Sequence, residues 1–98
     1  MLTSKQRSKL KSLANDMDAV ITIGKKEISD NLLTAIIDVL DKRELIKISI
    51  LQNSDIEPKS FINELCSILE AEPVLAIGKK MIIYRRSKKK GVKHIEID

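Results

Sequence analysis

The chain has 98 residues, of which 43% are hydrophobic and 33% are charged, and its formal net charge is +4 at pH 7. This length suits a single domain that buries a core without disulfides, and this composition excludes a disordered polypeptide. No apolar stretch is long enough to cross a bilayer, and no apolar run follows the basic amino-terminal residues, so we expect neither a membrane span nor a signal peptide. We therefore expect a cytoplasmic protein.

The charge is distributed unevenly along the chain. Residues 52–78 contain one basic and five acidic residues, whereas residues 79–98 contain eight basic and two acidic residues. A chain that is acidic in one segment and strongly basic in the next has a polarised field, which suits a polyanionic partner.

A helix and a strand are predicted for the first quarter of the chain. Apolar residues at helical spacing predict a helix over residues 3–17, with Thr3 or Ser4 as its N-cap. Residues 19–23 form a short run rich in β-branched side chains that ends at Gly24, which is typical of a buried strand.

A second helix and a second strand follow. Ser29 is a candidate N-cap for a helix that continues to about Lys42, because apolar residues recur on one face of residues 32–40. Residues 45–51 alternate cleanly, which predicts a strand. Its isoleucines, Ile46, Ile48 and Ile50, share one face, and Lys47 and Ser49 share the other.

The next segment predicts a third helix and a hairpin. Pro58 fits the first turn of a helix, and we expect Pro73 to end it. Two apolar runs, residues 74–77 and 81–84, are separated by residues 78–80, and this spacing predicts a tight hairpin. The chain after the hairpin is strongly basic and has no core-forming period before residue 92. We therefore predict one domain over residues 1–87 and a mobile basic tail over residues 88–98.

The order α-β-α-β-α-β-β predicts a two-layer α/β fold of the α+β type around a four-stranded sheet. Two strand–helix–strand units favour parallel pairing with right-handed crossovers, which place the second and third helices on the same face. We expect the first helix to cover part of the opposite face. The apolar side chains expected on that face are Leu45, Leu51, Met81 and Ile83.

The tetrapeptide IGKK occurs twice, at residues 23–26 and 77–80. The first copy precedes a helix, where free backbone N–H groups and the positive end of the helix dipole attract phosphate. If the strands before the two copies are parallel, both loops emerge at one edge of the sheet. The outer strands of a four-stranded sheet lie about 14 Å apart, a distance that successive phosphates of a folded nucleic acid can bridge.

We therefore predict a basic edge that binds a polyanion. Its predicted members are Gly24, Lys25, Lys26, Gly78, Lys79, Lys80, Arg85 and Arg86, with Lys5 and Lys9 of the first helix as additional contacts. The alternative for any one of these lysines is an ordinary solvated turn or helix face. The prediction rests on the meeting of the two loops and not on any single residue.

The aromatic residues limit how a nucleic acid could be recognised. Phe61 falls on the buried face of its helix, which leaves Tyr84 as the only other ring that could stack on a base. Sheets that read single-stranded bases usually use two or three such rings. Recognition is therefore expected to rest on phosphates and shape.

The sequence offers no catalytic or metal-binding constellation. Cys66, the only cysteine, lies in a helical pattern, and we expect a buried thiol in a reducing compartment. His94, the only histidine, lies in the basic tail, and no Cys/His cluster has metal-ligand spacing. A Walker-type or dinucleotide-binding glycine motif is also lacking. We predict no enzymatic activity, no cofactor and no metal.

Four segments, in this order and spacing, resemble the YhbY-like family, the small bacterial stand-alone form of the CRM domain (chloroplast RNA splicing and ribosome maturation). They are LTSKQRSKLKSLA, ITIGKKEISDNLL, RELIKISIL and VLAIGKKMIIYRR. The last is the most specific, because it is a glycine hairpin that closes in Tyr-Arg. The resemblance extends from about Thr3 to Arg86.

The resemblance implies a fold similar to the C-terminal domain of translation initiation factor three, with a mixed sheet of order 1-2-4-3 whose fourth strand is antiparallel to the others. It also implies RNA binding; bacterial members are associated with precursors of the large ribosomal subunit and plant relatives with intron splicing. The family has a GxxG motif in the loop after the first strand. Gly24 matches the first glycine, and Glu27 stands at the position of the second.

Our hypothesis from the sequence is an RNA-binding module that docks on structured ribosomal RNA or a precursor of the large subunit. We expect a monomer without a membrane or a small-molecule partner. Two alternatives stay open. One is a protein that binds double-stranded DNA through the same edge, and the other is an adaptor that docks on a ribosomal protein through the third helix and its acidic flank.

Overall fold

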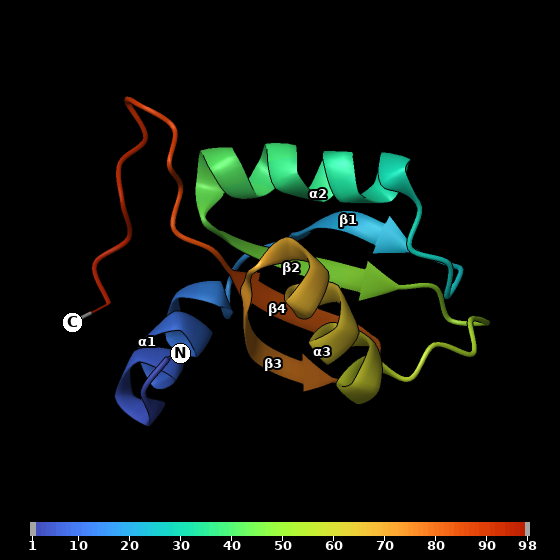
Figure 1. Cartoon of the computed structure of the whole chain (residues 1–98). Helices are drawn as coiled ribbons and strands as arrows, with labels where there is room; N and C mark the ends of the chain where they lie inside the picture. The colour runs from blue at the N-terminus through green and yellow to red at the C-terminus, as the bar shows by residue number, and fades with distance from the viewer. Residues whose placement is uncertain (1, 98) are drawn as a thin grey trace.

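The computed structural model describes residues 2–97 (Figure 1). Along this range the chain forms three helices and four strands in the predicted order. The helices are α1 (Ser4–Ala14), α2 (Asp30–Arg43) and α3 (Pro58–Leu69), and the strands are β1 (Ala19–Ile23), β2 (Leu45–Ile50), β3 (Glu72–Ile77) and β4 (Lys80–Tyr84).

The strands form one mixed sheet in the order β1-β2-β4-β3. β1 pairs with β2 in parallel, whereas β4 is antiparallel to both β2 and β3. β1, β2 and β3 therefore point the same way, and their carboxyl-terminal ends lie at the same end of the sheet (Figure 1). The predicted fold class and strand order are confirmed.

The helices cover the two faces of the sheet unequally. α2 and α3 pack on one face against the isoleucines of β2, as predicted, and α1 packs on part of the other face. Met81 and Ile83 were expected on the α1 side, but they lie in the α2–α3 core. The pairing of Ile46 with Ile83 fixes this register and turns Ile82 and Tyr84 toward α1. Leu51, also expected there, is 49% exposed.

Capping residues set most of the helix boundaries. Thr3 and Gln6 form a capping box at the start of α1, which ends at Ala14 and not near residue 17. Ser29 caps α2 through a hydrogen bond from the Leu32 N–H to Ser29 Oγ (3.1 Å), as predicted. Pro58 occupies the first turn of α3, also as predicted.

Two expectations about the strands and the end of α3 are wrong. α3 ends because Glu70 adopts the left-handed conformation (φ 55°), and Pro73 lies within β3. An edge strand tolerates proline there because the missing N–H is not needed by a neighbouring strand. β1 was expected to be buried, yet only Ile23 in it is buried, since β1 is the other edge of the sheet.

The chain after β4 returns to the domain. The sequence predicts a mobile tail from residue 88 onward, but the described part of this segment runs back past the carboxyl-terminal end of α2 and the side of α1 (Figure 1). Ile95 and Ile97 pack against the α1-side core, and His94 contacts Glu44. No local pattern predicts this return, because its anchor, Glu44, lies about 50 residues away in the sequence.

Candidate nucleic-acid interface

Three loops meet at the end of the sheet where β1, β2 and β3 finish. Leu51 donates its backbone N–H to the carbonyl oxygen of Ile23 (3.0 Å), and Ile50 donates its own to that of Lys79 (2.7 Å). The β1–α2 loop and the β3–β4 turn therefore flank the end of β2, which confirms that both IGKK loops emerge together. We call this region the GKK end; it comprises residues 24–29, 51–57 and 78–80.

The β2–α3 connection holds both loops by their lysines. Lys26 Nζ lies 3.5 Å from Asp55 Oδ2, and the two side chains are 64% and 86% exposed. An ion pair this exposed contributes little to stability, so a phosphate can displace Asp55 from Lys26. Lys79 Nζ donates to the carbonyl oxygen of Ser54 at 3.0 Å. Lys79 therefore organises the turn as well as charging it.

Lys25 and Lys80 are the cations of the GKK end that are most open to a ligand. Both side chains are exposed. Within residues 2–97, neither side chain makes a hydrogen bond or an ion pair. Lys80 begins β4 and stands in register with Ser49 of β2 and Ile77 of β3. Its position is thus fixed by the sheet, although its ammonium group remains in solvent.

Beside Lys80, α1 leaves part of the sheet face uncovered. Thr22 and Ser49 are paired across β1 and β2, and their hydroxyl oxygens lie 3.0 Å apart on the exposed surface. Ile77 and Leu51 add apolar surface at 64% and 49% exposure. These four residues were not predicted as site residues. The alternating pattern of β2 could have indicated Ser49, because it places Ser49 on the face away from the isoleucines.

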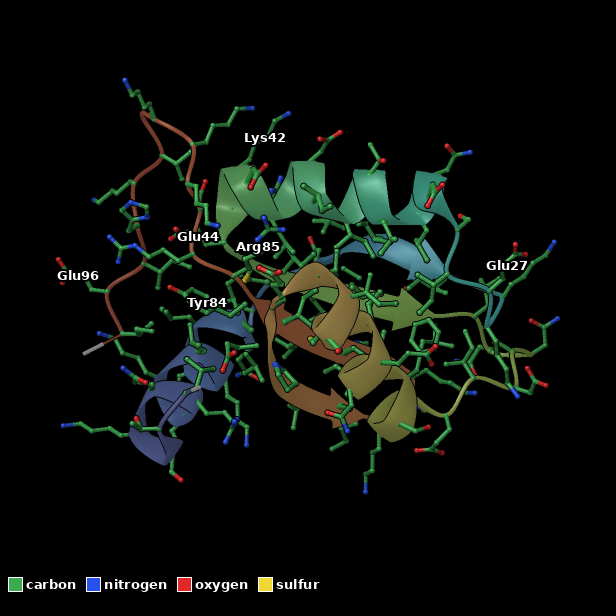
Figure 2. All side chains as sticks on the ribbon, viewed as in Figure 1. Glu27, Lys42, Glu44, Tyr84, Arg85 and Glu96 are labelled. Carbon is green, nitrogen blue, oxygen red and sulfur yellow. The ribbon has the colours of Figure 1, made fainter. Side chains whose placement is uncertain are left out.

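Gly24 packs closely against Leu51 at this end. A Cβ atom at Gly24 would lie 2.6 Å from Leu51 Cδ1, so glycine lets the loop pass tightly over the end of β2. Glu27, at the position of the second glycine of the GxxG motif, is exposed on the loop (Figure 2). It adds a negative charge next to the lysines.

The start of α2 is less electropositive than the sequence suggested. The Ser29 hydroxyl already accepts the N–H of Leu32, and Asp30 stands in the first turn. An acidic residue there offsets the positive end of the helix dipole. Attraction of an anion to the GKK end therefore depends mainly on the lysine side chains.

Four predicted residues do not join the GKK end. β4 runs away from it, so Arg85 and Arg86 lie about 17 Å further along the sheet. There the Arg85 N–H donates to the carbonyl oxygen of Glu44 (2.8 Å). Figure 2 shows Arg85 well away from Glu27, toward the other end of the sheet. The prediction that one edge gathers all these cations is wrong for both arginines. Lys80 begins β4 at the GKK end, whereas Arg85 and Arg86 follow the last residue of β4 at the other end of the sheet.

Lys5 and Lys9 also lie away from the GKK end. Their helix, α1, is tied to the start of β3 by a hydrogen bond from the Leu2 N–H to Glu72 Oε1 (2.9 Å) and one from Arg7 Nε to the Pro73 carbonyl oxygen (3.4 Å). The start of β3 lies opposite the GKK end. We call this opposite region the Glu44 end; it comprises residues 43–44 and 71–72 and the segment 85–95, which Glu44 contacts at Ser87, His94 and Ile95.

The structure also settles the roles open to two other residues. Tyr84, the remaining candidate for stacking on a base, is 5% exposed and packs beside α1, so it presents no ring to a ligand. Burial, with a smaller contribution from the Glu72 charge, raises the pKa of the Cys66 thiol to about 12. A thiol this weakly acidic is a poor nucleophile at neutral pH.

Among residues 2–97, no three His, Cys, Asp or Glu side chains gather in a way that could hold a metal ion. None of the helices in this range has the length and apolarity needed to cross a membrane. The fold and the GKK end thus define a small α/β protein with two lysine-bearing loops side by side on the end of a mixed sheet.

Comparison with known proteins identifies its family. The CRS1/YhbY (CRM) domain model matches residues 2–85, and the chain belongs to this family. It is 34% identical over 97 residues to the Bacillus subtilis "Probable RNA-binding protein YqeI", covering 99% of both chains. It is 32% identical over 87 residues to a Haemophilus influenzae "RNA-binding protein", covering 88% of this chain and 87% of that one.

A solved structure supports the same assignment. The solution structure of the Staphylococcus aureus protein SAV1595 superposes with a TM-score of 0.77 at 38% sequence identity, covering 97% of this chain and 100% of that one. The resemblance predicted from the four sequence segments is therefore confirmed.

Proposed function

We propose that the protein binds structured RNA through the GKK end, and that its target is ribosomal RNA in precursors of the large ribosomal subunit. It acts in the cytoplasm as a monomeric binding protein without catalysis. The observation that carries the proposal is the meeting of two lysine-bearing loops from distant parts of the chain over an uncovered sheet face. The names of the relatives support RNA as the polyanion.

The chemistry of the GKK end favours backbone and shape recognition. Lys25 and Lys80 supply two mobile ammonium groups, and Lys26 supplies a third once Asp55 is displaced. Thr22 and Ser49 offer hydroxyls that can bond to phosphate or to a ribose 2′-OH, the group that distinguishes RNA from DNA. Without a stacking ring at this surface, sequence reading is weak.

The test is a double charge reversal at the two open lysines, Lys25→Glu with Lys80→Glu. We expect binding to ribosomal RNA fragments to weaken about tenfold or more, because two phosphate contacts become repulsive. The matched control reverses Lys9 and Lys11 of α1, which changes the net charge equally and measures non-specific attraction. We expect less than about a threefold loss for the control. Equal losses in the two variants would remove the GKK end from the proposal.

Two further measurements separate the alternatives. Duplex DNA should compete poorly with ribosomal RNA if the hydroxyl pair contacts the 2′-OH; efficient competition would favour a DNA-binding protein. Association with ribosomal precursors should be lost after nuclease treatment, whereas an adaptor that docks through α3 would stay attached through protein contacts. Crosslinking in cells followed by sequencing of the attached RNA identifies the target directly.

A further inference from the structure

The Glu44 side chain holds the chain after β4 at two places. Its carboxylate is 1% exposed. Glu44 Oε2 accepts the Ser87 N–H (2.6 Å) and lies 2.6 Å from His94 Nδ1, and Glu44 Oε1 accepts the Ile95 N–H (2.7 Å). One side chain thus closes the segment between Ser87 and His94 into a loop.

Further contacts shape the start and the turn of this loop. Ser87 is buried, its hydroxyl donates to the Asp41 carbonyl oxygen (2.7 Å), and the same hydroxyl oxygen accepts the Lys89 N–H (3.1 Å). Gly91 has φ 85°, a conformation that glycine adopts without strain and that reverses the chain. The loop is therefore held at its base by Ser87 and reverses direction at Gly91.

The side chains that the loop presents are almost all cationic. We call residues 88–93 the lysine loop; its lysines, all exposed, are Lys88, Lys89, Lys90 and Lys93. The bond between Ser87 and Asp41 places the base of the loop at the end of α2, where Lys42 and Arg43 are also exposed (Figure 2). The described acidic neighbours are fewer: Asp41 is half-buried, Glu44 is buried with its carboxylate occupied by hydrogen bonds, and Glu96 is exposed.

Burial alone would raise the pKa of the Glu44 carboxyl. Hydrogen bonds from His94, Ser87 and Ile95 outweigh burial and hold the pKa below its ordinary value, so the group is ionised at neutral pH. An ionised carboxylate accepts both N–H groups more strongly than a neutral side chain does. The loop is thus closed by a charged acceptor at neutral pH.

We propose that the lysine loop is a second phosphate-binding site, which holds one segment of RNA while the GKK end holds another. The inference rests on the proposed function, because it assumes that RNA is the partner of the GKK end. The two sites lie at opposite ends of a molecule whose longest dimension is 37 Å (Figure 1). A loop that is closed before binding loses less conformational entropy on binding than a free tail of the same charge. The protein therefore bridges two RNA segments.

The experiment uses two RNA hairpins of unrelated sequence, each with a duplex shorter than 37 Å, one carrying a donor fluorophore and one an acceptor. With the full-length protein we expect energy transfer and a complex, measured by native mass spectrometry, of one protein chain with two hairpins. The loop variant replaces Lys88, Lys89 and Lys90 with Gln. It should keep the first hairpin and bind the second about tenfold more weakly.

Two further variants test whether the charge of the lysine loop is sufficient to bind the second hairpin when the loop is not closed. Glu44→Gln keeps every lysine but turns a donating amide toward Ser87 N–H and His94, which opens the base of the loop. We expect a loss of second-hairpin binding of about threefold or more, with thermal unfolding as a check that the domain is folded. His94→Ala removes only one contact and should give a smaller loss in a folded protein. The charge control, Lys5, Lys9 and Lys11 to Gln, should leave the stoichiometry at two hairpins.

The outcomes distinguish this inference from the proposed function. If wild-type protein binds a single hairpin, or if the loop variant binds both as wild type does, the lysine loop is not a site. The proposed function then survives provided that reversal of Lys25 and Lys80 weakens binding. If that reversal has no effect and only the loop variant loses RNA, the loop binds RNA and the GKK end does not. If Glu44→Gln and His94→Ala both bind as wild type does, closure of the loop plays no part.

Discussion

The GKK end and the Glu44 end both present lysines, but they support them differently. At the GKK end the lysines stand in turns that the strands themselves position, through pairing such as that of Ile50 with Lys79. At the Glu44 end they stand in a segment without regular structure that one buried carboxylate holds in place. The first surface follows from the topology of the sheet, whereas the second depends mainly on one side chain, that of Glu44.

This difference predicts unequal costs of mutation at the two ends. Replacing an open lysine of the GKK end should change binding and leave the stability of the fold almost unchanged, because such side chains make few contacts. Replacing Glu44 should change stability first. The following predictions test this contrast, from the largest effect to the smallest.

The largest effect is expected for Glu44→Ala, with about 3 kcal/mol lost from the free energy of unfolding, because two backbone N–H donors and His94 lose a charged acceptor. Glu44 also has φ 65°, which is unfavourable for a residue with a Cβ atom. Glu44→Gly relieves that strain and should be about 1 kcal/mol more stable than Glu44→Ala. Urea unfolding of both variants, with Lys80→Ala as the control, checks this. Equal stabilities of Glu44→Ala and wild type would contradict the contrast.

The contrast also matches what could be predicted from the sequence. The two IGKK copies, the cap at Ser29, the proline at the start of α3 and the hairpin at Gly78 are local patterns. Such patterns predicted the elements and the meeting of the two lysine-bearing loops, and the family resemblance supplied the strand order. The prediction for Arg85 was wrong because the basic residues before and after β4 were assigned to one edge. The length of β4 separates Lys80 from Arg85.

The Glu44 end could not be predicted in the same way. In the sequence, Glu44 is one of several charged residues between a helix and a strand, and residues 88–93 belong to the predicted mobile basic tail. Hydrogen bonds connect them over sequence separations of 43 to 51 residues, and no periodicity or spacing predicts such a contact. A buried acid that satisfies distant backbone groups is visible only once the fold is known.

Lowering the pH should have a smaller effect on stability than Glu44→Ala. Protonation of the Glu44 carboxylate weakens its hydrogen bonds without removing its oxygen atoms. The pKa of Glu44 is lower in the folded chain than its ordinary value of 4.5. The carboxylate therefore stabilises the fold above about pH 4.5, and this contribution is lost as the pH falls through the lower, folded-state pKa. Thermal unfolding of wild type and Glu44→Gln from pH 7 to pH 3 measures it. The difference between them should shrink toward acid pH, and a constant difference would argue against an ionised Glu44.

The smallest effect belongs to the GKK end and concerns Gly24. The Cβ atom of Gly24→Ala would lie 2.6 Å from Leu51 Cδ1, the far end of a flexible side chain that is 49% exposed and can move aside. We expect a loss of about 0.5 to 1 kcal/mol in the free energy of unfolding, and recovery of most of it in the double variant with Leu51→Ala. Urea unfolding of the two single variants and the double variant gives the coupling between the residues. The turns here are positioned by strand pairing, so movement of the Leu51 side chain should leave them in place. A loss as large as that of Glu44→Ala would show that the GKK end also depends on one contact.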